Sequence, residues 1–190
     1  YIMDYKIILA SNSPRRKELL SGLNIPFKVF VKDGIDESYP ESTPVDDVSL
    51  DLSRLKSSAY LQDIKEDELI ITADTVVVVD DEILGKPKDK DDAFRMLRMI
   101  SGRTHKVITG VSFTTTSKQR SFKVTTEVTF KELEDKEINY YISTFKPYDK
   151  AGSYGIQEWI GYIGVTSIKG SYFNVMGFPV QRIYEELKNI

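Results

Sequence analysis

The chain of 190 residues has no cysteine and a single histidine, His105. Without cysteine, disulfides, thiolate metal sites and a cysteine nucleophile are excluded. A lone histidine cannot complete a structural zinc site, so we interpret His105 as a structural hydrogen-bonding residue. No apolar run reaches the ~20 residues that cross a bilayer, and a signal peptide's apolar stretch is absent. We expect a cytoplasmic protein with no membrane partner.

The sequence also lacks an excess of basic residues. The 26 basic and 29 acidic residues give a formal net charge of −3, so no overall positive field would hold nucleic acid, and we expect no nucleic-acid partner. Neither an internal repeat nor a flexible linker divides the sequence. We expect one domain over residues 1–190, with Tyr1 and Ile2, which precede Met3, as a remnant outside the natural chain.

Hydrophobic periodicity and turn residues predict an α/β chain with a mixed sheet. The run at 69–79 is dense in β-branched residues and is typical of a central strand buried on both faces. Strands are predicted at 6–10, 69–79, 107–114, 122–130 and 162–168, and helices at 14–22, 44–59, 91–100, 134–145 and from 179 onward.

Three cations, Arg15, Arg16 and Lys17, follow the predicted start of the first helix. Ser13 is a typical N-cap, and Arg15 and Arg16 fall in the first turn, where the helix dipole disfavours positive charge by about 0.3–1 kcal/mol each. A bound phosphate would compensate, since free backbone N–H groups and Ser11 could donate beside the two arginines. The alternative is a solvated basic turn whose positive charge is compensated by Glu18.

An acidic side chain interrupts the buried strand at its centre. A carboxylate such as Asp74 in this position costs several kcal/mol unless it is paired or bound to metal. A catalytic base or metal ligand is one interpretation, and a structural ion pair with a nearby lysine is the other. Lys86 follows in a loop made rigid by Pro87 and could return to the same region.

Other polar candidates carry weaker signals. Lys56 could simply cover the surface of the second helix. Asp36 and Glu37 lie in an acidic loop that could be solvated or could supply an oxygen ligand to Mg²⁺. Gln157 is the one amide in a loop with two glycines, AGSYGIQ, where it could read a base, although glycine-rich turns are common.

Six segments, taken in order, resemble the Maf family of nucleotide pyrophosphatases over nearly the whole chain. They are LASNSPRRKELL, DES, ADTVVVVDDEILGKP, DAFRML with ISGRTHKVITGV, DKAGSYGIQ and GSYFNVMGFP. The resemblance implies an elongated, twisted mixed sheet flanked by helices, with two lobes and a central cleft, similar to inosine triphosphate pyrophosphatase. It also implies a homodimer.

The resemblance further implies roles for individual residues. Matching positions suggest substrate binding by Ser11, Arg15 and Arg16, catalytic roles for Lys56, Lys86 and Asp74, and a metal site at Glu37 and Asp74. A divalent cation, Mg²⁺ or Mn²⁺, would be the cofactor and a nucleoside triphosphate the substrate. Asp74 would also take the proton of the attacking water. Where many relatives have a small residue after the glutamine, this chain has Glu158-Trp159.

Three positions bear on the choice of base. Arg15, Thr75 and Gln157 together resemble the family branch that prefers dTTP and UTP, whereas the branch acting on 7-methyl-GTP tends to carry Tyr, Gln and Glu. An amide both donates and accepts, which suits the edge of thymine or uracil.

The alternative function is a nucleotide-sensing regulator of septum formation that acts through protein binding. Effects on cell division that persist in an inactive Asp74 variant would favour it.

Overall fold

The structure, a computed structural model, describes residues 4–190, so the interpretation of Tyr1 and Ile2 falls outside the described residues. The chain divides into two compact units. The first comprises the described residues up to Asp74, Thr109–Val124 and Gly177–Ile190, and the second Thr75–Ile108 and Thr125–Met176. The prediction of a single domain over the whole chain stays a prediction, as does that of a central cleft.

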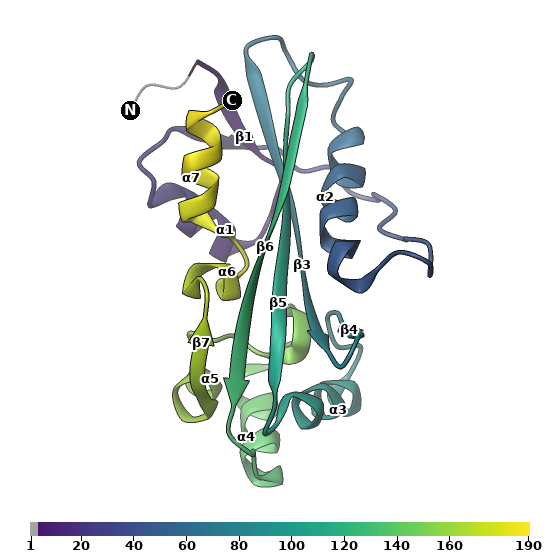
Figure 1. Ribbon diagram of the computed structural model, residues 1–190, viewed down its shortest axis with the longest axis vertical. Helices are drawn as coiled ribbons and strands as arrows, with labels where there is room; N and C mark the ends of the chain where they lie inside the picture. The colour runs from purple at the N-terminus through teal and green to yellow at the C-terminus, as the bar shows by residue number, and fades with distance from the viewer. Residues whose placement is uncertain (1–3) are drawn as a thin grey trace. The chain divides into compact units, whose positions relative to one another are not determined.

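The predicted mixed α/β architecture is confirmed (Figure 1). The strands form a seven-stranded sheet in the order β2-β1-β3-β5-β6-β7, with β4 paired to β3. Strand β1 runs parallel to β2 and β3, whereas β3–β4 and β6–β7 are antiparallel. The strands are β1 (Lys6–Leu9), β2 (Phe27–Val29), β3 (Glu68–Val79), β4 (Glu82–Leu84), β5 (Thr104–Thr114), β6 (Gln119–Phe130) and β7 (Val165–Lys169). The helices are α1 (Pro14–Ser21), α2 (Val48–Ser58), α3 (Lys90–Ile100), α4 (Asp135–Phe145), α5 (Trp159–Gly164), α6 (Tyr172–Met176) and α7 (Val180–Lys188), with short 3-10 turns at η1 (Val45–Asp47) and η2 (Ala151–Ser153).

In the first unit, both faces of the sheet are covered. Helices α1 and α7 lie on one side of the strands and α2 on the other (Figure 1). Ile7 and Leu9 of β1 join the apolar cluster that includes Leu20 of α1. Ile8, between them, packs with Tyr60 on the opposite side. Because successive side chains of a strand point to opposite faces, this explains why the strands here read as continuous apolar runs rather than as alternating ones.

In the second unit, helices α3, α4 and α5 share an apolar cluster with β3, β5 and β6. Val77 and Val79 belong to that cluster, whereas Val78 lines a pocket instead. A chain reversal links β3 to β4 through Asp80 and Asp81, both at positive φ (47° and 65°). Two consecutive left-handed residues are typical of a type I′ hairpin turn.

Local capping signals place several helix ends correctly. Ser13 caps α1, Pro14 is its first residue, and the helix closes at Gly22. Helix α3 ends at Ile100, as predicted, with Ser101 as its C-cap. Gly102, at φ +67°, is the left-handed residue after the cap.

Two predicted elements need correction. The helix expected over 44–59 begins as the 3-10 turn η1, and α2 itself starts at Val48. The strand predicted at 162–168 is shorter, because its first residues belong to helix α5. Gly161 allows that helix to form, since a Cβ there would lie 1.8 Å from the carbonyl oxygen of Ile156.

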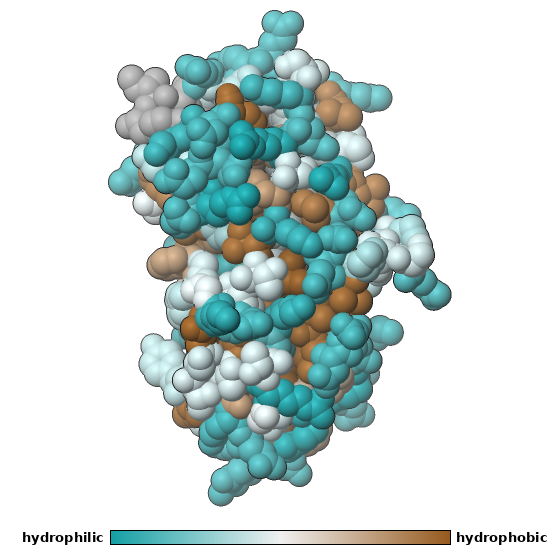
Figure 2. All heavy atoms as spheres, viewed as in Figure 1, coloured by the Kyte–Doolittle hydropathy of each residue, from teal (hydrophilic) through white to brown (hydrophobic). Residues whose placement is uncertain are grey.

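On the face shown in Figure 2, hydrophilic side chains predominate, with smaller apolar areas between them. Single aromatic side chains are exposed, among them Tyr162 (82%) and Tyr140 (51%). Across residues 4–190, no helix has both the length and the apolar character needed to cross a membrane.

Candidate functional site

The N-terminus of α1 is organised by two serines. The backbone N–H of Ser13 donates to Ser11 Oγ at 3.1 Å, and the backbone N–H of Arg16 donates to Ser13 Oγ at 3.3 Å. The cap fixes where the helix begins and therefore where Arg15 and Arg16 leave the backbone. The predicted phosphate-binding segment is thus a capped helix start, with Ser11 directly before it.

Arg16 reaches from this helix to the central strand. Its Nε donates to the carbonyl of Gly177 at 3.0 Å and its Nη1 to the carbonyl of Ala73 at 3.4 Å. Burial lowers the pKa of Arg16, while the negative charge of Asp74 opposes that shift and the neighbouring Arg15 adds to it. An arginine keeps its proton in such surroundings, so Arg16 places a permanent positive charge beside the middle of β3.

Lys56 extends from α2 to the same point of the strand. Its Nζ donates to the carbonyl of Ala73 at 3.0 Å and to Asp74 Oδ1 at 3.1 Å, and it lies 3.3 Å from Glu37 Oε1. Only 17% of the Lys56 side chain is exposed. These contacts contradict the alternative in which Lys56 merely covers the surface of its helix.

Asp74 is the least exposed carboxylate of this group, with 14% of its side chain accessible. Burial raises its pKa, and the positive charges of Lys56 and Arg16 oppose the rise. The ion pair with Lys56 is the contact that a purely structural role for Asp74 predicts. A purely structural ion pair would not need Glu37 on the same ammonium group, or Arg16 on the carbonyl of Ala73. Four predicted site residues thus lie together in the first unit: Arg16, Glu37, Lys56 and Asp74.

Two carboxylates that share one ammonium group are also candidates for holding a cation. Within residues 4–190, no group of three or more histidine or acidic side chains is arranged as a metal site. Mg²⁺ is commonly bound by one or two carboxylates, with waters and substrate phosphates as its other ligands. Glu37 and Asp74 match that donor set in kind and number, since they are two carboxylates whose oxygens lie within 3.3 Å of one common atom, Lys56 Nζ.

The second unit carries the other predicted site residues. Lys86 is exposed just after β4, and Gln157 is exposed in a loop that follows η2. The two loops are joined, since the N–H of Gly152 donates to the carbonyl of Gly85 at 3.1 Å. Thr75, the residue after Asp74, is half-buried in β3.

Hydroxyl groups that the sequence did not single out hold the loop of Gln157. Tyr154 Oη lies 2.6 Å from Nε2 of His105, which bears out the structural role predicted for the histidine. Tyr141 contacts the loop through its hydroxyl, at Gly155 and Glu158. The only sequence signal was indirect: Tyr141 lies on the apolar face of a predicted helix, and a buried tyrosine hydroxyl usually has a hydrogen-bond partner.

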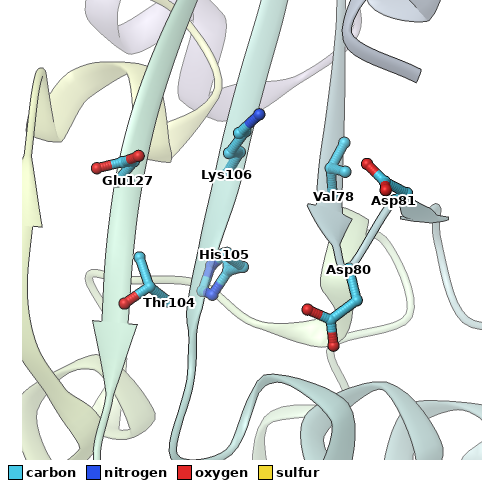
Figure 3. A pocket seen from close by; sticks show the side chains of 7 residues that line it. All are labelled: Val78, Asp80, Asp81, Thr104, His105, Lys106 and Glu127. Atoms are coloured by element: carbon cyan, nitrogen blue, oxygen red, sulfur yellow. The ribbon is translucent and has the colours of Figure 1, made fainter. Parts of the chain in front are cut away.

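A separate pocket of about 330 Å³ opens in the second unit (Figure 3). None of the predicted site residues lines it. Its lining consists of Val78, Asp80, Asp81, Thr104, His105, Lys106 and Glu127. Three of these are carboxylates, which would repel a triphosphate, and one of them, Asp80, is paired with Arg103 at 2.6 Å.

Comparisons with known proteins agree with one another. A dTTP/UTP pyrophosphatase of Phocaeicola vulgatus is 60% identical over 98% of this chain and 96% of its own length, and one of Porphyromonas gingivalis is 53% identical over 97% and 94%. Among solved structures, a HAM1 protein from Coxiella burnetii matches the fold with a TM-score of 0.52 at 10% identity, covering 98% of this chain and 100% of that one. The sequence model of the Maf-like proteins matches residues 6–190. With a family model and relatives of this similarity spanning almost its full length, the chain belongs to the Maf family.

Proposed function

We propose that this chain is a nucleoside-triphosphate pyrophosphatase that hydrolyses dTTP and UTP to the monophosphate and pyrophosphate. The observation that carries the proposal is the convergence of Arg16, Lys56 and Asp74 on one point of β3. The names of relatives 50–60% identical to the chain support the same activity and substrates.

Hydrolysis requires a water molecule to attack the α-phosphorus. The water oxygen forms a bond to phosphorus, the bond from phosphorus to the α,β-bridging oxygen breaks, and pyrophosphate leaves with the electron pair of that bond. Asp74 takes the proton of the water, and burial suits it to this task because a raised pKa makes a carboxylate a stronger base. The ammonium group of Lys56 holds the carboxylate in place at 3.1 Å.

Charge neutralisation supplies most of the remaining catalysis. Arg16 and Lys56 face the negative charge that spreads over the phosphate oxygens. The family resemblance assigns a further catalytic role to Lys86. Ser11 and the capped start of α1 donate hydrogen bonds to phosphate. A divalent cation, Mg²⁺ or Mn²⁺, held by Glu37 and Asp74 would lower the pKa of water and screen the carboxylates from the phosphates.

We assign recognition of the nucleotide base to Gln157, together with Arg15 and Thr75. The side-chain amide of Gln157 can donate to one uracil carbonyl and accept from the ring N–H. A site that pairs with a specific polar edge rejects a mismatched edge more strongly than apolar shape alone can. The 5-methyl group of thymine is tolerated, since one methyl is worth only about 1–3 kcal/mol of discrimination.

The test is a panel of triphosphates assayed for both monophosphate and pyrophosphate with Mg²⁺, Mn²⁺ and Co²⁺. We expect kcat/KM for dTTP, UTP and 5-substituted uracil nucleotides to lie well above that for CTP, ATP and GTP. Equal or higher values for CTP or 7-methyl-GTP would refute the substrate assignment and leave the pyrophosphatase activity standing. Release of single phosphate instead of pyrophosphate would refute the reaction itself.

Homodimer formation, which the family resemblance implies, and a cytoplasmic location, which the lack of a predicted signal peptide or membrane span suggests, belong to the same proposal. Sedimentation at micromolar concentration tests the first: a single species of twice the mass of 21.7 kDa is expected. Fractionation of cells that express the chain tests the second.

A further inference from the structure

The loop that carries Gln157 is a tight turn closed at both ends by one tyrosine. The N–H of Glu158 donates to the carbonyl of Gly155 at 3.0 Å, which makes Gly155–Glu158 a β-turn with Gln157 in its third position. The N–H of Gly155 donates to Tyr141 Oη at 3.0 Å. The same hydroxyl donates to Glu158 Oε1 at 2.5 Å.

Burial makes this arrangement rigid. The Tyr141 side chain and its neighbour Ile156 belong to the apolar cluster of the second unit. Burial raises the pKa of Tyr141, and the hydrogen bond to Glu158 raises it further, so the hydroxyl stays protonated and remains a donor. A Cβ at Gly155 would lie 2.8 Å from Glu158 Oε1, so a larger residue there would displace that carboxylate. Within this turn, only Gln157 is exposed.

Glu158 is also held from a second side. Lys150 Nζ lies 3.8 Å from Glu158 Oε1 and 3.0 Å from Asp149 Oδ1. Only 13% of the lysine side chain is exposed. The carboxylate therefore has one buried neutral donor, Tyr141, and one mostly buried cation beside it, which together restrict its rotamers.

We propose that Tyr141 and Glu158 are positioning residues for base selection: they hold the Gly155–Glu158 turn so that the Gln157 amide presents a fixed hydrogen-bonding edge. This inference rests on the proposed function, in which Gln157 reads the base. An amide on a mobile turn can rotate and pair with either a uracil or a cytosine edge, and selectivity is then lost. The glutamate that follows Gln157 in this chain thus acts through the hydroxyl of Tyr141.

The main test substitutes the tyrosine hydroxyl alone. Tyr141→Phe keeps the ring, which stacks on Phe145 at a centroid distance of 5.3 Å. We expect kcat/KM for dTTP to fall at least five-fold while that for CTP changes less than two-fold, so that the dTTP/CTP ratio falls. Tyr140→Phe is the matched control, since its ring contact with Trp159 is kept, and its ratio should equal the wild-type ratio.

Two variants of Glu158 separate the hydrogen bond from simple packing. Glu158→Ala removes the acceptor and should lower the ratio as Tyr141→Phe does. Glu158→Gln keeps an acceptor oxygen for the Tyr141 hydroxyl and should restore most of the ratio. The double variant Tyr141→Phe/Glu158→Ala should be no worse than the poorer single variant, because both act on one contact. Glu158→Ala also keeps the proposal testable if Tyr141→Phe does not fold.

Hydrogen exchange at the Gly155 amide gives a readout that does not depend on turnover. Faster exchange in Tyr141→Phe than in Tyr140→Phe is expected. Equal loss of activity on dTTP and CTP, or a preserved ratio in Tyr141→Phe alongside a lost ratio in Gln157→Ala, would overturn this inference alone. A wild-type enzyme with no preference for dTTP over CTP would instead overturn the proposed substrate, and this inference with it.

Discussion

Lys56 and Asp74 form an ion pair, with Nζ 3.1 Å from Oδ1, between a helix and the middle of a central strand. Both side chains are less than one-fifth exposed. The same ammonium group also contacts Glu37 and the carbonyl of Ala73. Loss of one partner lowers the free energy of unfolding more for a buried pair than for a surface pair, because the remaining buried charge loses its main compensating partner and is shielded from water.

Replacing the base should abolish turnover without unfolding the protein. Asp74→Asn keeps the size of the side chain but removes its capacity to accept a proton. We expect kcat for pyrophosphate release to fall by about 10²–10⁴-fold. The melting temperature should fall less than when Lys56 is replaced, because Lys56 keeps the carboxylate of Glu37 as a partner. Near-wild-type turnover would show that Asp74 is not the base.

Replacing the lysine should affect both activity and stability. Lys56→Met leaves Asp74 without its cation, so we expect a more than ten-fold lower kcat/KM and a lower free energy of unfolding, by up to about 3 kcal/mol. Lys6→Met is the matched control, because Lys6 pairs with Asp67 at the same 3.1 Å but with both side chains more than half exposed. Its effect in urea denaturation should be within about 1 kcal/mol; similar losses in both variants would contradict the buried-pair argument.

Metal removal is expected to abolish activity. The single charge of Lys56 offsets only one of the two carboxylates of Glu37 and Asp74, so this acidic pair repels a triphosphate unless a metal cation lies between them. Excess EDTA should therefore stop pyrophosphate release, and added Mg²⁺ or Mn²⁺ should restore it. Full activity in EDTA would exclude Glu37 and Asp74 as metal ligands.

Stability should depend on pH through His105. Burial lowers its pKa from 6.5 to about 4, and its Nδ1 has no hydrogen-bond partner among the described residues. His105 therefore becomes protonated below pH 6.5 in the unfolded chain, but only near pH 4 in the folded protein. The contribution of neutral His105 is complete above pH 6.5 and is lost as the pH falls toward 4.

Urea denaturation at pH 7 and pH 5 measures this effect. Wild type should lose about 2 kcal/mol more than His105→Gln over that interval, because one pKa unit corresponds to about 1.36 kcal/mol. An equal loss in both proteins would show that other groups cause the dependence.

Close packing at Gly110 links the fold to the site. A Cβ at this position of β5 would lie 2.3 Å from the carbonyl oxygen of Ser49 in α2, the helix that carries Lys56. Gly110→Ala should lower the free energy of unfolding by about 1–3 kcal/mol or more and also reduce kcat/KM as the helix shifts. Gly85→Ala, with nothing within 4 Å of the added atom, is the control for stability; equal melting temperatures would contradict the packing argument.

Local signals sufficed where an element depends on neighbouring residues. The start of α1 follows from the Ser13 cap and Pro14, and β3 follows from its run of β-branched residues. Local signals failed where two parts of the backbone pack closely. At Gly161 a Cβ would lie 1.8 Å from the carbonyl oxygen of Ile156, and only glycine allows helix α5 to form where a strand was expected.

The mixed α/β class, the capped helix start with its two arginines, and the family could all be predicted from the amino-acid sequence, because each depends on residue types and spacing over short stretches. Which charged side chains meet could be seen only once the chain was folded. Arg16 binds the carbonyl of a residue 161 positions away, and Lys56 reaches Asp74 across 18. Such contacts depend on how helices pack against a strand, which is set by the shapes of many buried side chains together. The sequence indicated that Asp74 and Arg16 need partners, but not which residues those partners are.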